Sequence, residues 1–441
     1  AVGQLNDNIR VSTLIMKSII SLILLTLILA FPNAPQSDDK PYITTQTPIT
    51  LLSANDGDVD FHWRKTREGL RDREVKTQDS ITVIHLGPDH PPISKTVYGT
   101  VPSTIIGTPT MAMSSDGRYG IVANHGFRGR TDFASLIYPE GVPLTNADIR
   151  PGDLGKQKLA APLSNMLSLI DLASPDLKVV DRELLDDGPI HVLPHPDGKH
   201  FVVGAVKSFY VYRIHNGQLI QISHSPQEHG LPCFWINPKG DRILATQGWL
   251  DGEPTRIHWY AVVNNQVRHL SEVKVKAGVD TELVATSYIL RISLDGKLAL
   301  VCQDAGLFPP LCDIPIVDLT LEKPAITSVI KHVGPGVESF AFHPNGKMAV
   351  ATCLAQHKNS IAVLNIASKP ARLLYHLDAG GIGQGIEFTP EGDKLFVGSA
   401  AASRIEVYDV VGEYELRKNQ KFLKTGRSHC NLTIGPRWLR K

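Results

Sequence analysis

Four polar residues of the sequence could carry acid–base chemistry: two histidines, a glutamate and an arginine. A neutral imidazole, such as that of His191 or His429, can take a proton from water near pH ~7. The guanidinium of Arg427 could hold a substrate carboxylate or stabilise an oxyanion, and Glu338 could orient a histidine or share its proton. Such a set meets the needs of lactone hydrolysis, which are a base for water, an oxyanion stabiliser and an acid for the leaving alkoxide. This chemistry requires no metal ion and no other cofactor.

Four further residues are candidates for substrate binding. His229 and Gln384 precede expected inner strands, and His125 and Arg128 begin a long insertion. All eight candidates would meet only if the inner strands begin around one common opening, which depends on the elements that position them.

The positioning elements are strands joined by a repeated short turn. The turns read SSDG, HPDG, NPKG, SLDG, HPNG and TPEG, and they end at Gly117, Gly198, Gly240, Gly296, Gly346 and Gly392. Asp-Gly and Asn-Gly between apolar runs are hairpin signals, because glycine accepts a positive φ. A β-branched and aromatic run follows each turn, as in NSIAVLNI and SRIEVYDV. Each unit therefore holds four strands, which we letter a to d: one on each side of the turn, the valine-rich run and an outer strand.

A seventh unit is split between the two ends of the chain. The run Ser80–Leu86 has no turn before it, and the C-terminus supplies HCNLTI, a Gly-Pro turn and the run at 437–441. We expect the two C-terminal runs to be strands a and b of a blade whose strands c and d come from residues 80–101. The fold class predicted is all-β, a seven-bladed β-propeller of four-stranded blades, the last one closed by N- and C-terminal strands. A linear β-solenoid would not predict complementary half-units at its ends.

The repeats resemble a known family. Segments such as SSDGRYGIVAN, HPNGKMAVATC and TPEGDKLFVGSA look like the YVTN repeat, and residues 80–441 are similar to the lactonase-like propeller superfamily with its 6-phosphogluconolactonase-type members. GPIH, ending at His191, and GRSH, ending at His429, resemble the family's Gly-Pro-Arg-His segment, with Ile190 in place of the arginine. The resemblance implies the propeller fold and, for an enzyme, a lactonase-type hydrolase. Binding proteins without catalysis also belong to the superfamily.

One face of the expected ring is the candidate site. The a–b turns, with His195 and His343, lie on the opposite face, so we expect those two histidines to be structural. The b–c loops and the connections between blades surround the channel mouth. In the first blade the b–c connection at 125–164 is unusually long, which is typical of functional loops, and we interpret it as a lid over the mouth.

The N-terminal residues indicate export. Residues 18–31 are uncharged and almost wholly apolar, with Lys17 before them and Ala34 after them. This pattern is typical of a signal peptide, because 14 apolar residues are short for the ~20 of a membrane span. We therefore predict upstream residues plus a signal peptide at 1–34, an extension or linker at 35–79 and the propeller at 80–441. The expected location is periplasmic or secreted, with no membrane association beyond the signal segment.

The charge composition indicates which classes of partner the protein could bind. The 441 residues include 45 Lys and Arg against 44 Asp and Glu, a net charge of +1 that disfavours nucleic acid as a partner. We expect a small-molecule ligand or a protein partner at the channel mouth.

Cysteines and histidines show no metal-binding spacing. The 5 cysteines form no CxxC pair, and no HxH or HExxH segment occurs. Cys302 and Cys312 could bridge neighbouring strands in an oxidising compartment, or could be buried thiols.

Three functions remain open from the residues. The first is an exported lactonase-like enzyme that hydrolyses or isomerises a small carboxylated lactone or sugar acid. The second is a non-catalytic propeller that binds a ligand or protein. The third, a redox-partner propeller, is disfavoured because the chain lacks a CxxCH haem attachment motif. The first predicts that the polar candidates converge at the mouth, and the second that they scatter.

Overall fold

The computed structural model divides into two compact units, Ala1–Pro41 and Tyr42–Lys441, and the fold below is that of the second. The structure describes residues 40–55, 80–98, 109–124, 166–186, 188–205, 207–228, 233–247, 256–274, 289–302, 312–353, 361–381 and 383–436. No helix in these ranges is long and apolar enough to cross a membrane.

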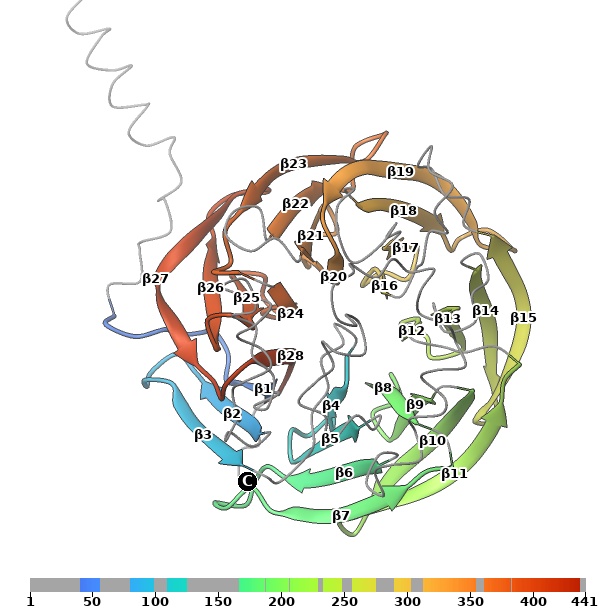
Figure 1. The fold of residues 1–441 in the computed structure, drawn as a ribbon, viewed down its shortest axis with the longest axis horizontal. Coiled ribbons are helices and arrows are strands. Elements are labelled where there is room, and N and C mark those ends of the chain that lie inside the picture. The colour runs from blue at the N-terminus through green and yellow to red at the C-terminus, as the bar shows by residue number, and fades with distance from the viewer. Residues whose placement is uncertain are drawn as a thin grey trace, which may run out of the picture. The chain divides into compact units, whose positions relative to one another are not determined.

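Seven four-stranded antiparallel sheets stand in a ring, which confirms the predicted seven-bladed propeller (Figure 1). In blades 1 to 6, four consecutive strands run from strand a at the centre to strand d outside. Those strands are β4 (Met111–Met113), β5 (Tyr119–Asn124), β6 (Met166–Asp171) and β7 (Val179–Leu184); β8 (Pro189–Pro194), β9 (His200–Ala205), β10 (Ser208–His215) and β11 (Gln218–Pro226); β12 (Cys233–Ile236), β13 (Arg242–Thr246), β14 (Arg256–Val263) and β15 (Gln266–Lys274); β16 (Leu290–Ile292), β17 (Leu298–Val301), β18 (Cys312–Asp318) and β19 (Ala325–Gly334); β20 (Val337–Phe342), β21 (Met348–Cys353), β22 (Ile361–Asn365) and β23 (Arg372–Leu377); β24 (Gly383–Phe388), β25 (Lys394–Ser399), β26 (Arg404–Val410) and β27 (Leu416–Lys424).

Blade 7 joins the two ends of the chain, as predicted, but with a different division of strands. Its order is β28 (His429–Pro436), β1 (Ile49–Asn55), β2 (Ser80–Leu86) and β3 (Ile93–Tyr98) (Figure 1). The C-terminus thus supplies one strand and the N-terminal region three, where we expected two and two. Residues 437–441, the expected second strand, lie outside the described residues.

Strand β1 corrects the expected start of the propeller at Ser80. Leu51 pairs with Ile434 of β28 on one side and with Ile84 of β2 on the other. All seven residues of β1 are buried, because the strand is interior to its sheet and both of its faces pack against neighbouring blades. The segment expected to be an extension or linker therefore contains a strand of the ring.

The Gly-containing turns connect strands a and b, as predicted. In the first of them the Gly117 N–H donates to the Ser114 carbonyl at 2.8 Å, and the other five turns make the same bond. The glycine φ values in these six turns lie between 70° and 77°, the left-handed region in which a side chain is strained.

Two turn histidines fasten neighbouring turns to each other. The Nε2 of His195 lies 2.9 Å from the Gly240 carbonyl, and the Nε2 of His343 lies 2.8 Å from the Gly392 carbonyl. Because a carbonyl can only accept, each Nε2 carries the proton and donates it to the next blade. Both histidines are thus structural, on the face opposite the inner-strand beginnings.

The core fills the spaces between blades. The largest apolar cluster joins blades 4 and 5, and it includes Cys302, Cys312 and Cys353 with isoleucine, valine and phenylalanine side chains. All five cysteines of the chain are buried thiols outside any disulfide, so Cys302 and Cys312 are not bridged. Of the two interpretations of Cys302 and Cys312, a disulfide or buried thiols, the structure confirms the buried thiols.

Candidate functional site at the mouth of the central channel

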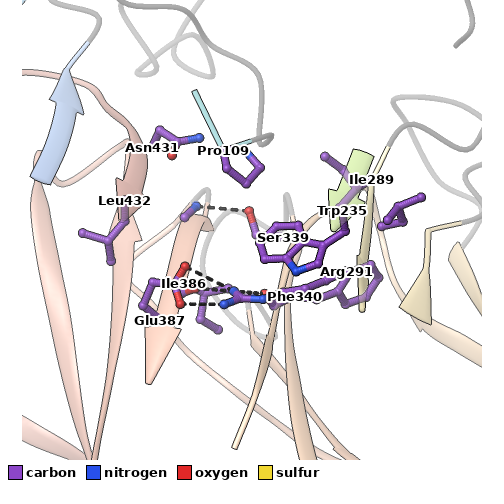
Figure 2. Close-up of a pocket in the computed structure, with 12 residues that line it drawn as sticks. Pro109, Trp235, Ile289, Arg291, Ser339, Phe340, Ile386, Glu387, Asn431 and Leu432 are labelled. Carbon is purple, nitrogen blue, oxygen red and sulfur yellow. Dashed lines mark hydrogen bonds and ion pairs between the residues drawn. The ribbon is translucent and has the colours of Figure 1, made fainter. Parts of the chain in front are cut away.

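Two of the predicted residues lie side by side at the beginnings of neighbouring inner strands. Glu338 of β20 and Gln384 of β24 each precede the first residue of their turn, His343 or Thr389, by five positions. The residues that follow them are joined, since the Gly385 N–H donates to Ser339 Oγ at 3.2 Å (Figure 2). Glu338 and Gln384 therefore share one level on blades 5 and 6.

His429, at the start of β28, adds blade 7 to this group. Its Nε2 lies 2.8 Å from the Gln384 carbonyl, and its Nδ1 lies 2.7 Å from the Ser53 hydroxyl of β1. Burial lowers the pKa of His429 to about 4, so the imidazole is neutral at neutral pH. Because both ring nitrogens are engaged, His429 ties three strands together and is not placed to take a proton from water.

His191 lies on β8 of blade 2, away from the other three. Its Nδ1 accepts the Phe234 N–H of blade 3 at 3.1 Å, and its ring packs against the Phe234 ring with centroids 4.5 Å apart. Burial lowers the pKa of His191 to about 3. Its Nε2 has no hydrogen-bond partner among the residues that the structure describes. The contacts of His191 are therefore those of a neutral imidazole between two blades.

The remaining candidates are placed only in part. Arg427 is half-buried in the connection from β27 to β28, two residues before His429. His125, Arg128 and His229 lie outside the described residues, and so does the insertion expected to form a lid. Glu338, Gln384 and His429 are thus brought together on blades 5 to 7, with Arg427 next to them in the chain.

A charged group that we did not predict lies just inside the mouth. Arg291 of β16 forms a bidentate pair with Glu387 of β24, with Nη2–Oε2 at 2.7 Å and Nη1–Oε1 at 3.3 Å (Figure 2). The guanidinium carbon stands 4.7 Å from the centre of the Trp235 ring. All three residues precede the first residue of their turn by two positions, a spacing that could have placed them at one level of the channel.

This pair is shielded from solvent. Each side chain is 14% exposed. Burial raises the pKa of Glu387, and the paired Arg291 offsets part of that effect. A hollow beside the pair has a volume of ≈ 20 Å³, room for about one water. This hollow therefore does not hold a sugar-sized ligand.

The described residues contain no group of three or more His, Cys, Asp and Glu side chains that could hold a metal ion. The candidate residues that the structure describes supply a carboxylate, a primary amide, an imidazole and a guanidinium. Such a set can bind and orient a carboxylate or carbonyl oxygen, and its carboxylate can accept a proton.

Comparisons with known proteins identify the fold. No protein-family model and no curated protein sequence matches the chain. Among solved structures, the periplasmic gluconolactonase of Pseudomonas aeruginosa is 12% identical with a TM-score of 0.58, and the match covers 88% of this chain and 99% of that one. A candidate 6-phosphogluconolactonase from Bacteroides fragilis is 13% identical, with a TM-score of 0.56 and coverage of 89% and 99%. Its counterpart from Bacteroides uniformis is 14% identical, with a TM-score of 0.55 and coverage of 88% and 100%. At these identities the likeness concerns the fold alone. The chain is a seven-bladed β-propeller with the architecture of these lactonase-type proteins.

Proposed function

We propose that this chain is a lactonase-type hydrolase that opens a small carboxylated lactone at the channel mouth. The supporting observation is the meeting of Glu338, Gln384 and His429 at the beginnings of three successive inner strands. The fold shared with a gluconolactonase supports the reaction class.

We assign the roles from the chemistry of the side chains. The Glu338 carboxylate takes a proton from water, and the water oxygen attacks the lactone carbonyl. Arg427 pairs with the substrate carboxylate, and the Gln384 amide donates to the developing oxyanion. When the intermediate collapses, the ring C–O bond breaks and Glu338 returns the proton to the leaving alkoxide. His429 holds the Gln384 backbone through its Nε2–H, which is a different role from the base that we first assigned to it.

The test is hydrolysis of a lactone panel by the purified protein, followed by acid release. Muconolactone, which carries a carboxylate, is the matching probe, and glucono-1,5-lactone and galactono-1,4-lactone, which carry none, test whether that carboxylate is needed. We expect Glu338→Gln to lower kcat/KM by about 10²–10⁴-fold, the usual contribution of a general base. Glu322→Gln, at an exposed glutamate, is the matched control and should leave the rate unchanged. Equal activity of the wild type and Glu338→Gln would contradict the assignment.

A second candidate is ligand binding without turnover. It is favoured by the two buried imidazoles, whose contacts are those of structural groups between blades. Saturable binding of a probe by calorimetry, with no acid release in the same sample, would select this function over hydrolysis.

We further propose that the protein is exported to the periplasm or secreted, which the apolar run at residues 18–31 supports. The mature chain should begin after Ala30 or Ala34. N-terminal sequencing of protein from fractionated cells checks this, and a full-length chain found only in the cytoplasm would contradict it.

A further inference from the structure

The guanidinium of Arg291, a residue of blade 4, contacts three other blades at once. It stacks on Trp235 of blade 3 and pairs with Glu387 of blade 6, as described above. In addition, its Nη1 donates to the Phe340 carbonyl of blade 5 at 2.7 Å and to the Ile386 carbonyl of blade 6 at 3.3 Å. A side chain from blade 4 therefore fixes the inner strands of its neighbours.

Two of these contacts lie close to the proposed site. Phe340 follows Glu338 by two residues on β20, and Ile386 follows Gln384 by two residues on β24. Two residues of a strand span about 6.6 Å. Both site residues lie where the strand pairing is irregular, Glu338 between Val337 and Ser339 and Gln384 between Gly383 and Ile386, so the backbone that follows decides their placement and a shift of either carbonyl would move the corresponding site residue.

The chemistry of the contact requires an arginine. In a planar guanidinium Nη2 can serve the carboxylate while the two N–H groups of Nη1 are shared between the carboxylate and two carbonyls, whereas a lysine presents a single charged nitrogen. The ring of Trp235 covers one guanidinium face, which further limits its motion.

We propose that Arg291 is a positioning residue of the channel-mouth site, which sets the spacing between Glu338 and Gln384 by tying β20 to β24 from inside the channel. The inference rests on the proposed function, because it needs a ligand that both residues contact. It adds that turnover depends on a side chain that does not itself touch the ligand.

Hydrogen exchange and kinetics of three variants test this role. Arg291→Met removes every polar contact of the guanidinium, and Arg291→Lys keeps the charge without the planar group. The control is Arg256→Met, which removes the ion pair between Arg256 and Glu272 on the outer strands of blade 3. We expect Arg291→Met to speed amide exchange in the peptides of β20 and β24. We also expect kcat for the best lactone to fall about tenfold or more with KM within about twofold, and no rescue by Arg291→Lys. Arg256→Met should change neither.

The possible results distinguish failure of the inference about Arg291 from failure of the proposed function. Exchange that rises equally in all blades, or equally in Arg256→Met, would show a general loss of stability and overturn the inference. Unchanged kcat in Arg291→Met, beside a large loss in Glu338→Gln, would overturn it and leave the proposed function standing. If the wild type binds probes without turnover, an unchanged Kd in Arg291→Met overturns it, and a weakened Kd supports it. Absence of both turnover and binding in the wild type would overturn both proposals. Should Arg291→Met not fold, Arg291→Lys carries the same comparison.

Discussion

Acid should destabilise this propeller through its two buried imidazoles. Burial holds the pKa of His429 at about 4 and that of His191 at about 3, below the ordinary 6.5 that each regains on unfolding. The unfolded state therefore binds more protons below pH 6.5, and the stability that these groups contribute is present above pH 6.5 and is lost as the pH falls.

The size of the effect follows from the shifts. Between pH ~7 and pH ~5, each unfolded imidazole takes up about 0.7 proton while the folded one takes up about 0.1 proton or less. At about 1.36 kcal/mol per pH unit, each histidine should lose about 2 kcal/mol of stability over this range, and both together about 4 kcal/mol. For His429 the loss should level off below pH ~4, where the folded imidazole also becomes protonated.

The assay is urea unfolding at a series of pH values. His429→Gln should show a loss between pH ~7 and pH ~5 that is about 2 kcal/mol smaller than that of the wild type. His215→Gln, at an exposed histidine, should match the wild-type loss. If wild type and His429→Gln lose the same free energy over this range, the imidazole is not buried as a neutral group, and the reasoning fails.

Two further predictions concern the ring itself. Because Leu52 of β1 and Thr433 of β28 are register partners, Leu52→Cys with Thr433→Cys should form a disulfide, seen as a linked peptide by mass spectrometry; no link under oxidation would refute the pairing. Gly385→Ala should destabilise by about 2–5 kcal/mol, because φ is +74° and the new Cβ would lie 2.5 Å from the Leu432 nitrogen. Its matched control, Gly346→Ala, has a φ of +70° with nothing within 4 Å and should cost about 1–2 kcal/mol in thermal or urea unfolding; equal losses would disprove the overlap.

The blades were predictable because each repeat contains a local sequence pattern that identifies its strands. An apolar run, an Asx-Gly-type turn and a second apolar run specify strands a and b without knowledge of the rest of the chain. Strand β1 escaped prediction because the Asp56-Gly57 pair that follows Ile49–Asn55 leads into a charged segment and not into a second apolar run. Its place between β28 and β2 is decided by pairing with residues more than 370 positions away.

The sequence allowed better prediction of which residues lie at the candidate site than of what each residue does there. Counting from the turn placed Glu338 and Gln384 correctly at the beginnings of inner strands. The states of His191 and His429 depend on a backbone N–H and a carbonyl of the neighbouring blades, which no local pattern reveals. The pair of Arg291 and Glu387 skips a blade, so it could be expected only once the ring and its levels were known.

Closure by a single C-terminal strand has a consequence for biosynthesis. Strand β1 leaves the ribosome more than 370 residues before β28, the strand that covers its open edge. At about 5–20 residues per second, that edge stays unpaired for roughly 20–75 s. A nascent chain of this protein therefore carries an uncovered β-edge through most of its translation, and a chaperone that binds extended strands would find its target at Ile49–Asn55.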